Sequence, residues 1–500
     1  MLHSFLVCDV VVMRAILRYR RPLIGLATGL VVGLDYLNSA TVNFAESAIR
    51  SGMGADATTY LWLLSSYAGA GVLGIALQER LSRQMRYRTL LLSGAGLFVL
   101  GSLLASITSS FTALIIARVI QGLGGGPLLT CGRVMLQMNI HAKKRPKQLQ
   151  GFMLGLFLLS APGPWLSALI MQQGDWHSLF ALHVIAGLIV SAIAWLIIPK
   201  GMHYPRGTTH QDIGTLLLLC GGFFLWTHTI EDLHYQVFDS KSLLLVIAAL
   251  GLFAAIVWRI HKHPDPIFQP TILYNRRYLA GLTFYTLYYL ISSALSLLLP
   301  MYLLAGESLN QQSAGDLTSL GLVCTVLALP LYFRFAKHLP DRRFVMAFGF
   351  LLLAGLSIVL SFSATGNNTY SRLLPLMMLK GLFPLLVVIQ VAGLTFREFV
   401  ATDFAHAYAL KNVLRLLAST LGAGFADVYW QDAMAESRNA LIGHINQPLG
   451  VTFNTPQILT ELGQAINQQA ALLSASQGFL IIASCAVFAS GAVLIQKTLR

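Results

Sequence analysis

Long apolar runs recur along the whole chain, and this recurrence limits what the chain can fold into. A helix needs about 20 apolar residues to cross the hydrocarbon core of a bilayer, because each residue adds about 1.5 Å. The chain contains fourteen such runs, separated mostly by short polar segments. They predict an all-α membrane protein with fourteen transmembrane helices. The runs lie near residues 22–45, 59–79, 88–108, 111–138, 149–172, 177–199, 213–230, 242–260, 278–304, 314–336, 343–364, 374–396, 404–429 and 477–497.

The basic residues between the runs indicate how the helices are oriented. Lys and Arg accumulate in the short cytoplasmic loops of membrane proteins. If the N-terminus is cytoplasmic and the spans alternate, 25 of the 34 Lys and Arg residues are cytoplasmic and four are external. We therefore predict that both termini are cytoplasmic. The long segment 430–476 then lies outside, as either a spacer or a docking surface for a partner.

Composition excludes several other classes of protein. Only 11% of the residues are charged, whereas soluble domains have about 25%. The net charge of +14 does not indicate nucleic-acid binding, because the basic residues lie in short gaps between apolar runs and not on a soluble face. The five cysteines lack metal-binding spacing, so we expect neither a metal nor a cofactor. The first cations follow an apolar run instead of preceding it, unlike a signal peptide, and Met13 is an alternative start.

Ionisable residues inside apolar spans need a reason, because a charge at the bilayer centre costs at least about 2.5–3.5 kcal/mol on insertion scales. Asp35 lies in the middle of the first span, where its carboxyl group either carries a proton or a cation or forms a structural salt bridge. Arg118 lies in the fourth span and keeps its charge. Its charge either makes the binding of substrate and the binding of a proton mutually exclusive, as an antiporter requires, or has a structural role. Arg133 follows it, and we expect its side chain to snorkel to the interface.

The second half of the chain offers further polar candidates. Lys380 lies a few residues into the twelfth span, as either a cavity cation or a snorkelling residue. The thirteenth span carries Lys411, Asn412 and Arg415. Lys411 and Arg415 are four residues apart and share a helix face, which favours a basic stripe towards the cytoplasm. We keep Lys380, Asn412 and Arg415 as candidates for the second half, and expect Asp427 at the membrane interface.

Glycine and proline gather in the fourth and fifth spans. Gly122, Gly124 and Gly126 are close together, and Gly163 and Pro164 follow in the next span. Small residues allow helices to approach closely in lipid, and both residue types loosen the helical backbone. Such clusters suit helices that rock against each other.

These motifs resemble those of the fourteen-span drug:proton antiporter branch of the major facilitator superfamily, over nearly the whole chain. Residues 38–45 (NSATVNFA) are similar to its D-T-T-I-V-N-V-A, with Asn38 where the branch usually has aspartate. Residues 118–124 (RVIQGLG) match R-x-x-Q-G-x-G. Residues 163–168 (GPWLSA) match the antiporter signature G-P-x-x-G-G without its last two glycines. Residues 79–88 (ERLSRQMRYR) are a weak match to G-x-L-a-D-R-x-G-R-R, with the acidic residue and the central glycine missing.

The resemblance implies a fold and a division of the chain. It implies a major facilitator fold, with two six-helix bundles at 22–199 and 278–500 that rock around a central cavity. The second bundle would include the external loop 430–476. Residues 200–277 would hold two inserted helices with cytoplasmic linkers, and residues 1–21 a cytoplasmic N-terminal segment.

The same resemblance implies an activity. Protons moving inward would drive the export of amphiphilic small molecules, such as drugs or natural products, across the inner membrane. Gly163 and Pro164 would form the antiporter motif, and Gly122, Gly124 and Gly126 would serve packing and conformational change. The proton-coupling wall of the cavity would consist of Asp35, Asn38, Asn43, Arg118 and Gln121.

The resemblance also implies partner proteins, and other functions remain as alternatives. The long external loop resembles that of the inner-membrane pump of Emr-type tripartite exporters, which work with a periplasmic adaptor and an outer-membrane channel. A siderophore or metabolite exporter of the same fold is an alternative, and a proton-coupled uptake permease is less favoured. An enzyme is not expected, because no catalytic cluster gathers at one interface. No GxxxxGK[ST] sequence occurs, so ATP drive would need another chain.

Overall fold

The computed structural model describes residues 2–55, 57–204, 212–235, 240–263, 266–335, 341–396, 399, 401–445 and 456–499. Within these ranges the regular structure is helical and contains no strand, which confirms the all-α prediction. The helices are α1 (Leu2–Phe44), α2 (Glu46–Gly52), α3 (Ala57–Gln84), α4 (Tyr87–Ile107), α5 (Phe111–Gly125), α6 (Leu128–Asn139), η1 (Ala142–Lys144), α7 (Arg145–Ser160), α8 (Gly163–Met171), α9 (His177–Ile197), α10 (Ile213–Tyr235), α11 (Ser240–Lys262), η2 (Pro270–Tyr274), α12 (Arg276–Met301), η3 (Tyr302–Gly306), α13 (Gln311–Phe335), α14 (Arg342–Ser363), α15 (Tyr370–Lys380), α16 (Phe383–Thr395), α17 (Ala401–Ile445) and α18 (Pro456–Ile495).

Twelve segments of the described chain are long and apolar enough to cross a membrane. Two expected spans are not among them. In α10 the apolar part, Gly214–Ile230, is shorter than in the others. In α17 the charged residues Lys411, Arg415 and Asp427 lie among the apolar ones. The multi-pass membrane class is therefore confirmed, while the count of fourteen and the cytoplasmic termini stay predictions.

Three expected spans are each built from two helices with a break near a proline. The span 111–138 breaks between α5 and α6 at Pro127, and the span 149–172 between α7 and α8 at Pro162. The span 374–396 breaks between α15 and α16, just before Pro384. Proline has no backbone N–H to donate and its ring crowds the preceding turn, so the helix ends or bends there.

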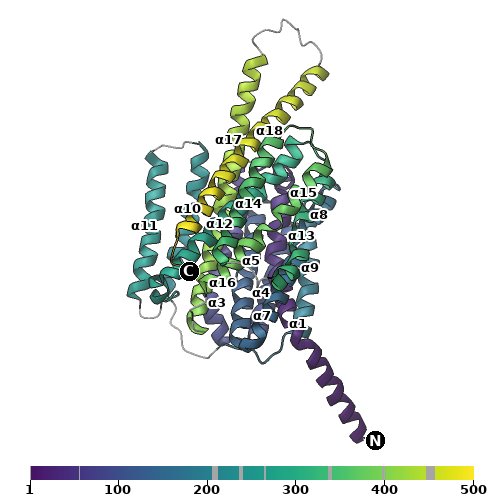
Figure 1. Ribbon diagram of the computed structural model, residues 1–500, viewed down its shortest axis with the longest axis vertical. Helices are drawn as coiled ribbons and strands as arrows, with labels where there is room; N and C mark the ends of the chain where they lie inside the picture. Colours follow the sequence, from purple (N-terminus) through teal and green to yellow (C-terminus); the bar gives the residue numbers. More distant parts are fainter. Residues whose placement is uncertain are drawn as a thin grey trace.

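The helices form one elongated bundle (Figure 1). In the first half of the chain α1 packs along α7, and α4 packs between α5 and α9. In the second half α12 packs along α17, and α14 along α18. The hairpin of α10 and α11 lies at the side of the bundle, where α10 also contacts α3 and α17 (Figure 1). Asp212 holds the hairpin together, because it accepts from Arg259 of α11 at 2.7 Å.

Helices extend beyond the bundle at both of its ends (Figure 1). The N-terminal part of α1 projects from one end, where the sequence predicted only a cytoplasmic segment before residue 22. From the other end α17 and α18 project together as a long hairpin. The segment 430–476, expected as a loop, is thus largely helical up to Ile445 and again from Pro456. The base of the hairpin is fixed where the Tyr429 hydroxyl donates to Ser474 O at 2.8 Å.

The glycines of α5 permit close packing of three helices. A Cβ atom on Gly122 would collide with the carbonyl oxygen of Tyr67 on α3, and one on Gly126 with the backbone of Gly71. A Cβ atom on Gly124 would collide with the carbonyl oxygen of Gly94 on α4. The obstacles are backbone atoms and not flexible side chains. Glycine is therefore required at these positions by the distance between the helices.

Replacing Gly122 with alanine is expected to destabilise the folded protein, because α3 and α5 must separate to admit the methyl group. Overpacking of this kind typically costs about 1–3 kcal/mol. The matched control is Gly96→Ala on α4, where an added Cβ atom meets nothing within 4 Å. Thermal unfolding in detergent, followed by fluorescence-detected gel filtration, compares the two variants. Equal melting temperatures for both would contradict the packing role of Gly122.

Candidate functional site

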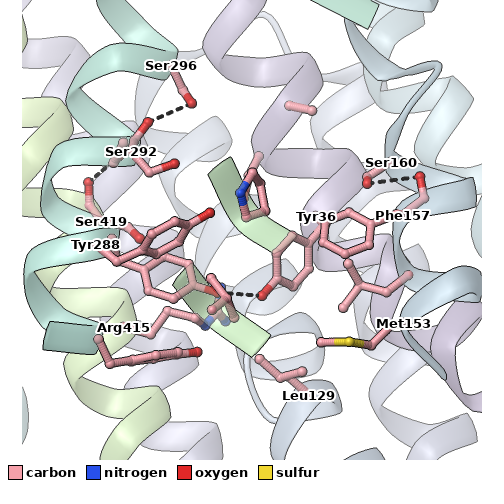
Figure 2. Close-up of a pocket in the computed structure, with 18 of the residues that line it drawn as sticks. Tyr36, Leu129, Met153, Phe157, Ser160, Tyr288, Ser292, Ser296, Arg415 and Ser419 are labelled. Carbon is pink, nitrogen blue, oxygen red and sulfur yellow. Dashed lines mark hydrogen bonds between the residues drawn. The ribbon is translucent and has the colours of Figure 1, made fainter. Parts of the chain in front are cut away.

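A cavity of about 640 Å³ lies at the centre of the bundle, between the first and second halves of the chain (Figure 2). Its wall comes from α1, α3, α5, α6, α7 and α8 on one side and from α12 to α17 on the other. At one end it reaches Pro146 of α7 and Arg342 of α14, which the charge bias assigns to the cytoplasmic side.

Asp35 of α1 forms an ion pair across the two halves. Its Oδ2 accepts from Nη2 of Arg415 on α17 at 2.8 Å, and its Oδ1 accepts from the Tyr67 hydroxyl at 2.6 Å. Both members of the pair are buried, with 1% of Asp35 and 4% of Arg415 exposed. A buried ion pair persists only when good geometry and additional hydrogen bonds offset its loss of hydration. Tyr67 supplies such a bond here.

Two tyrosines accompany this pair. The hydroxyl oxygens of Tyr36 and Tyr289 lie 3.0 Å apart, so α1 and α12 also meet directly (Figure 2). The Arg415 guanidinium lies 5.4 Å from the ring centre of Tyr36 and 5.9 Å from that of Tyr289. The cation is therefore held by one carboxylate and two aromatic faces.

Arg118 organises a second network inside the first half. Its Nη1 donates to Asn38 Oδ1 and to Gln121 Oε1, both at 2.6 Å, and its Nε donates to the carbonyl oxygen of Leu63 at 3.3 Å. Gln121 in turn donates to the Ser102 hydroxyl at 2.8 Å. The acceptors of Arg118 are all neutral. Its guanidinium also lies 4.5 Å from the ring centre of Tyr67, so this tyrosine touches both networks.

The other expected site residues lie in three different places. Asn43 and Lys380 line the cavity. Asn412 donates to the Thr130 hydroxyl at 2.7 Å and so connects α17 to α6. Pro164 also lines the cavity, whereas Gly163 packs against α1. The structure brings Asp35, Asn38, Arg118, Gln121 and Arg415 into two adjoining networks, and leaves Asn412 outside them.

The antiporter motif lies where the two halves meet beyond the cavity. The backbone N–H of Trp165 donates to Ser319 on α13 at 2.8 Å, and Gln172 donates to Gln312 at 3.1 Å. A Cβ atom on Gly315 would lie 3.0 Å from the carbonyl oxygen of Pro164. Helices α8 and α13 therefore close the end of the cavity that the charge bias assigns to the outside.

A charged cluster ties α2 to α17 at the same end. Arg50 Nη1 lies 3.0 Å from Glu46 Oε1 and 3.9 Å from Asp427 Oδ1. Burial and, secondly, the nearby Asp427 carboxylate raise the pKa of Glu46 to about 7. Asp427, which was expected at the membrane interface, is buried in the protein, with 1% exposed. The contacts of α8 with α13 and of α2 with α17 both join the two halves at this end of the cavity.

Glu79 connects α3 to α17 at the opposite end of the bundle, near the C-terminal end of α3. It lies 2.7 Å from Arg83 Nη2 and 3.0 Å from Nδ1 of His406 on α17. In residues 79–88 the position of the family's aspartate is occupied by Arg83, and Glu79, four residues earlier, pairs with it.

Several cavity residues were not identified from the sequence. Arg133 was expected to snorkel, but it lines the cavity with its guanidinium 4.9 Å from the Phe404 ring centre. Lys411 lies in the cavity wall between the rings of Tyr285 and Tyr408, with Nζ 4.2 and 4.0 Å from their centres. For Lys411, its four-residue spacing from Arg415 was the sequence feature that could have identified it as a cavity residue. Tyr67, Tyr288 and Tyr289, which the sequence offers as aromatic surface, do line the cavity, whereas Tyr285 and Tyr408 were not singled out, because aromatic residues in membrane helices mostly serve packing.

Comparison with known proteins adds the following findings. The family model for the Major Facilitator Superfamily matches residues 28–277. The Multidrug export protein EmrB of Haemophilus influenzae is 25% identical over 468 residues, which cover 92% of this chain and 91% of the relative. The Probable multidrug resistance protein EmrY of Escherichia coli is 24% identical, with 92% of each chain covered.

A solved structure extends the comparison to the fold. It is described as "Structural insights into substrate recognition in proton dependent oligopeptide transporters" and matches with a TM-score of 0.62. The match covers 94% of this chain and 98% of that one at 13% identity, so it bears on the fold alone. Among the described residues, no group of three or more His, Cys, Asp or Glu side chains is placed to hold a metal ion.

Proposed function

Since the chain belongs to the major facilitator superfamily, we propose that it exports amphiphilic small molecules across the inner membrane and that protons moving inward drive the export. The relatives named as multidrug export and multidrug resistance proteins, which match over nearly the whole chain, support this activity. The alternative within the same fold is an exporter of one siderophore or metabolite. The family consists of transporters, and we propose that the cargo leaves chemically unchanged.

The proposal of proton coupling rests on one observation, the ion pair between Asp35 and Arg415. It joins α1 to α17 in the wall of the cavity and is buried on both sides. Protonation of Asp35 removes the charge that holds Arg415, while arginine keeps its own charge throughout. A proton on Asp35 would thus loosen a contact between the halves and make the Arg415 guanidinium available to other groups.

The remaining candidate residues fit this scheme. Asn38, Asn43, Arg118 and Gln121 would keep the first-half wall of the cavity polar, next to Asp35. Lys380 and Arg415 would do the same in the second half. Gly163 and Pro164 would hold the external closure of α8 on α13, which must open for release. We keep 22–199, 200–277 and 278–500 as the first bundle, the inserted pair and the second bundle.

The projecting hairpin of α17 and α18 suggests a partner. It extends the transporter beyond the membrane on the side where the cargo would be released (Figure 1). We propose that a periplasmic adaptor docks on this hairpin and passes the cargo to an outer-membrane channel. Ile442 and Leu473 are exposed apolar side chains on it, at 37% and 46%.

The proposed function is tested in a pump-deficient strain that expresses the chain. Resistance to a panel of amphiphilic compounds is measured against the empty vector, and active compounds are then added to energised everted vesicles. We expect each of them to release part of the stored proton gradient, because cargo enters the vesicle as protons leave. Accumulation of the same compounds in right-side-out vesicles under an inward proton gradient would instead identify an uptake permease.

A further inference from the structure

Three charged side chains meet where α2 of the first half lies against α17 of the second. Glu46 and Arg50 belong to α2, and Asp427 belongs to α17. Arg50 Nη1 lies 3.0 Å from Glu46 Oε1 and 3.9 Å from Asp427 Oδ1, so one guanidinium faces two carboxylates. The central cavity ends close by, because Asn43 of α1 and Ala423 of α17 line it. The cluster therefore lies just beyond the cavity, at the end that the charge bias assigns to the outside.

The two carboxylates of this cluster are hidden from water, whereas its cation is not. The exposed fraction is 2% for Glu46 and 1% for Asp427, but 29% for the Arg50 side chain. Glu46 Oε1 accepts no hydrogen bond within the described part of the chain, although the Arg50 guanidinium stands beside it. If all three groups are charged, one buried negative charge is left uncompensated. A proton on Glu46 would remove that charge.

The surroundings of Glu46 determine how readily it takes up this proton. Burial has the largest effect and raises the pKa of Glu46, and the Asp427 carboxylate on α17 raises it further. Arg50 on the same helix opposes both effects, and the resulting pKa is about 7. From α3, the Tyr60 hydroxyl donates to the carbonyl oxygen of Val42 at 3.1 Å, and a phenol is neutral near this pH. Glu46 therefore titrates within the pH range of an ordinary medium, which an exposed glutamate does not.

We propose that Glu46 binds a second proton, distinct from that of Asp35, and that this proton controls whether the external end of the transporter is closed or open. With Glu46 protonated, one carboxylate faces one guanidinium, and α2 can stay against α17. Without the proton, two carboxylates share Arg50 in a place that water does not reach. Opening relieves this cost, because it hydrates both carboxylates. The inference rests on the proposed function and its orientation, and adds a residue that regulates the transport cycle.

The proton on Glu46 comes from the outside and returns to it. In the open conformation Glu46 is hydrated, and its pKa falls towards the ordinary value of a glutamate. Closing against Asp427 raises the pKa again, so closing takes up a proton and opening releases one. The closed conformation is therefore favoured at low external pH and loses this advantage as the pH rises to about 7. Only the proton on Asp35 would reach the cytoplasm, so the exchange of protons for cargo is unchanged.

The access of an external reagent to the cavity tests this inference. A variant without the five native cysteines receives one new cysteine, Ser296→Cys, in the cavity wall. Right-side-out vesicles with a fixed internal pH are treated with a membrane-impermeant maleimide, which reaches this cysteine only while the external end is open. The external pH is varied from 5.5 to 8.5, about the range in which such vesicles stay intact. Ser109→Cys, on the exposed loop between α4 and α5, corrects for the effect of pH on the thiol itself.

The corrected labelling rate of Ser296→Cys should rise by about tenfold between external pH 6 and pH 8, and should level off above about 7. Glu46→Gln keeps the shape of the side chain but has no proton to lose, so its rate should stay low at every pH. Asp427→Asn leaves Arg50 to Glu46 alone and should lose most of the rise. Glu436→Gln is the matched control, because this acid is exposed on the projecting part of α17, and it should leave the profile unchanged.

The outcomes separate this inference from the function on which it rests. A flat profile in the parent variant would overturn the inference. A rise that survives in Glu46→Gln would overturn it as well, and would assign the titration to another group such as Asp35. If Glu46→Gln fails to fold in gel filtration, Asp427→Asn decides instead, because a full rise there contradicts a role for the carboxylate pair. Export itself is measured independently by the compound panel, and silence there would contradict the proposed function and not the labelling profile.

Discussion

Replacing Asp35 with asparagine is expected to abolish efflux driven by the proton gradient. Asparagine has nearly the same shape and can still accept the hydrogen bond from Tyr67, but it cannot take up or release a proton. Arg415 also loses the carboxylate with which it pairs. Efflux of a compound that the unmodified chain exports is measured in everted vesicles with an imposed pH gradient. Asp175→Asn is the control, because that carboxylate is 52% exposed just before α9 and lies outside the cavity lining.

A double variant separates proton coupling from structural support. Removing one member of a buried ion pair typically costs about 3–5 kcal/mol, because the other charge stays behind uncompensated. Asp35→Asn combined with Arg415→Gln removes both charges and should recover much of the thermal stability lost in the single variant. We expect efflux to remain absent in the double variant. Full efflux in Asp35→Asn, or its recovery in the double variant, would show that the pair is structural only.

Replacing Arg118 with lysine is expected to lower efflux by about tenfold or more. The planar guanidinium serves three acceptors, since Nη1 donates to Asn38 and Gln121 and Nε donates to the carbonyl oxygen of Leu63. An ammonium group keeps the charge but not this geometry. At least one bond to a charged donor is then lost, and each is worth about 1.5–3 kcal/mol.

The efflux rate and the half-saturating substrate concentration are both measured for Arg118→Lys. Arg438→Lys provides the control, because Arg438 is exposed on the projecting part of α17. Gel filtration establishes that both variants insert and fold. Normal efflux in Arg118→Lys would mean that the charge alone suffices and that the hydrogen-bonding geometry of Arg118 has no part in transport.

The membrane class and most of the spans could be predicted from the sequence, because the bilayer requires long apolar helices. The same criterion failed at residues 430–476, where the apolar character ends but the helices continue. In water a helix depends on intrinsic propensity and on a packing partner, and this segment is rich in Ala, Leu and Gln. The two helices of the hairpin, α17 and α18, pack against each other. A hydropathy pattern does not show such packing between distant segments.

The site could be predicted only in part. Asp35 and Arg118 were identified because an isolated charge in an apolar run is costly. The partner of Asp35 is 380 residues away, and a single sequence contains no information on which distant side chains meet. Arg133 and Lys411 show a further limit. Whether a cation snorkels to the interface or faces a cavity depends on the rotation of its helix, which the packing of neighbouring helices decides.

The ion pair between Asp35 and Arg415 has an electrical consequence, because its single carboxylate can take up one proton. One proton carried inward by Asp35 in exchange for one neutral molecule would move one charge down an inside-negative membrane potential, which is worth about 2.3 kcal/mol per charge for each 100 mV. Such a pump would be driven by voltage as well as by pH. It would continue to work in an alkaline medium, where the pH difference across the membrane vanishes.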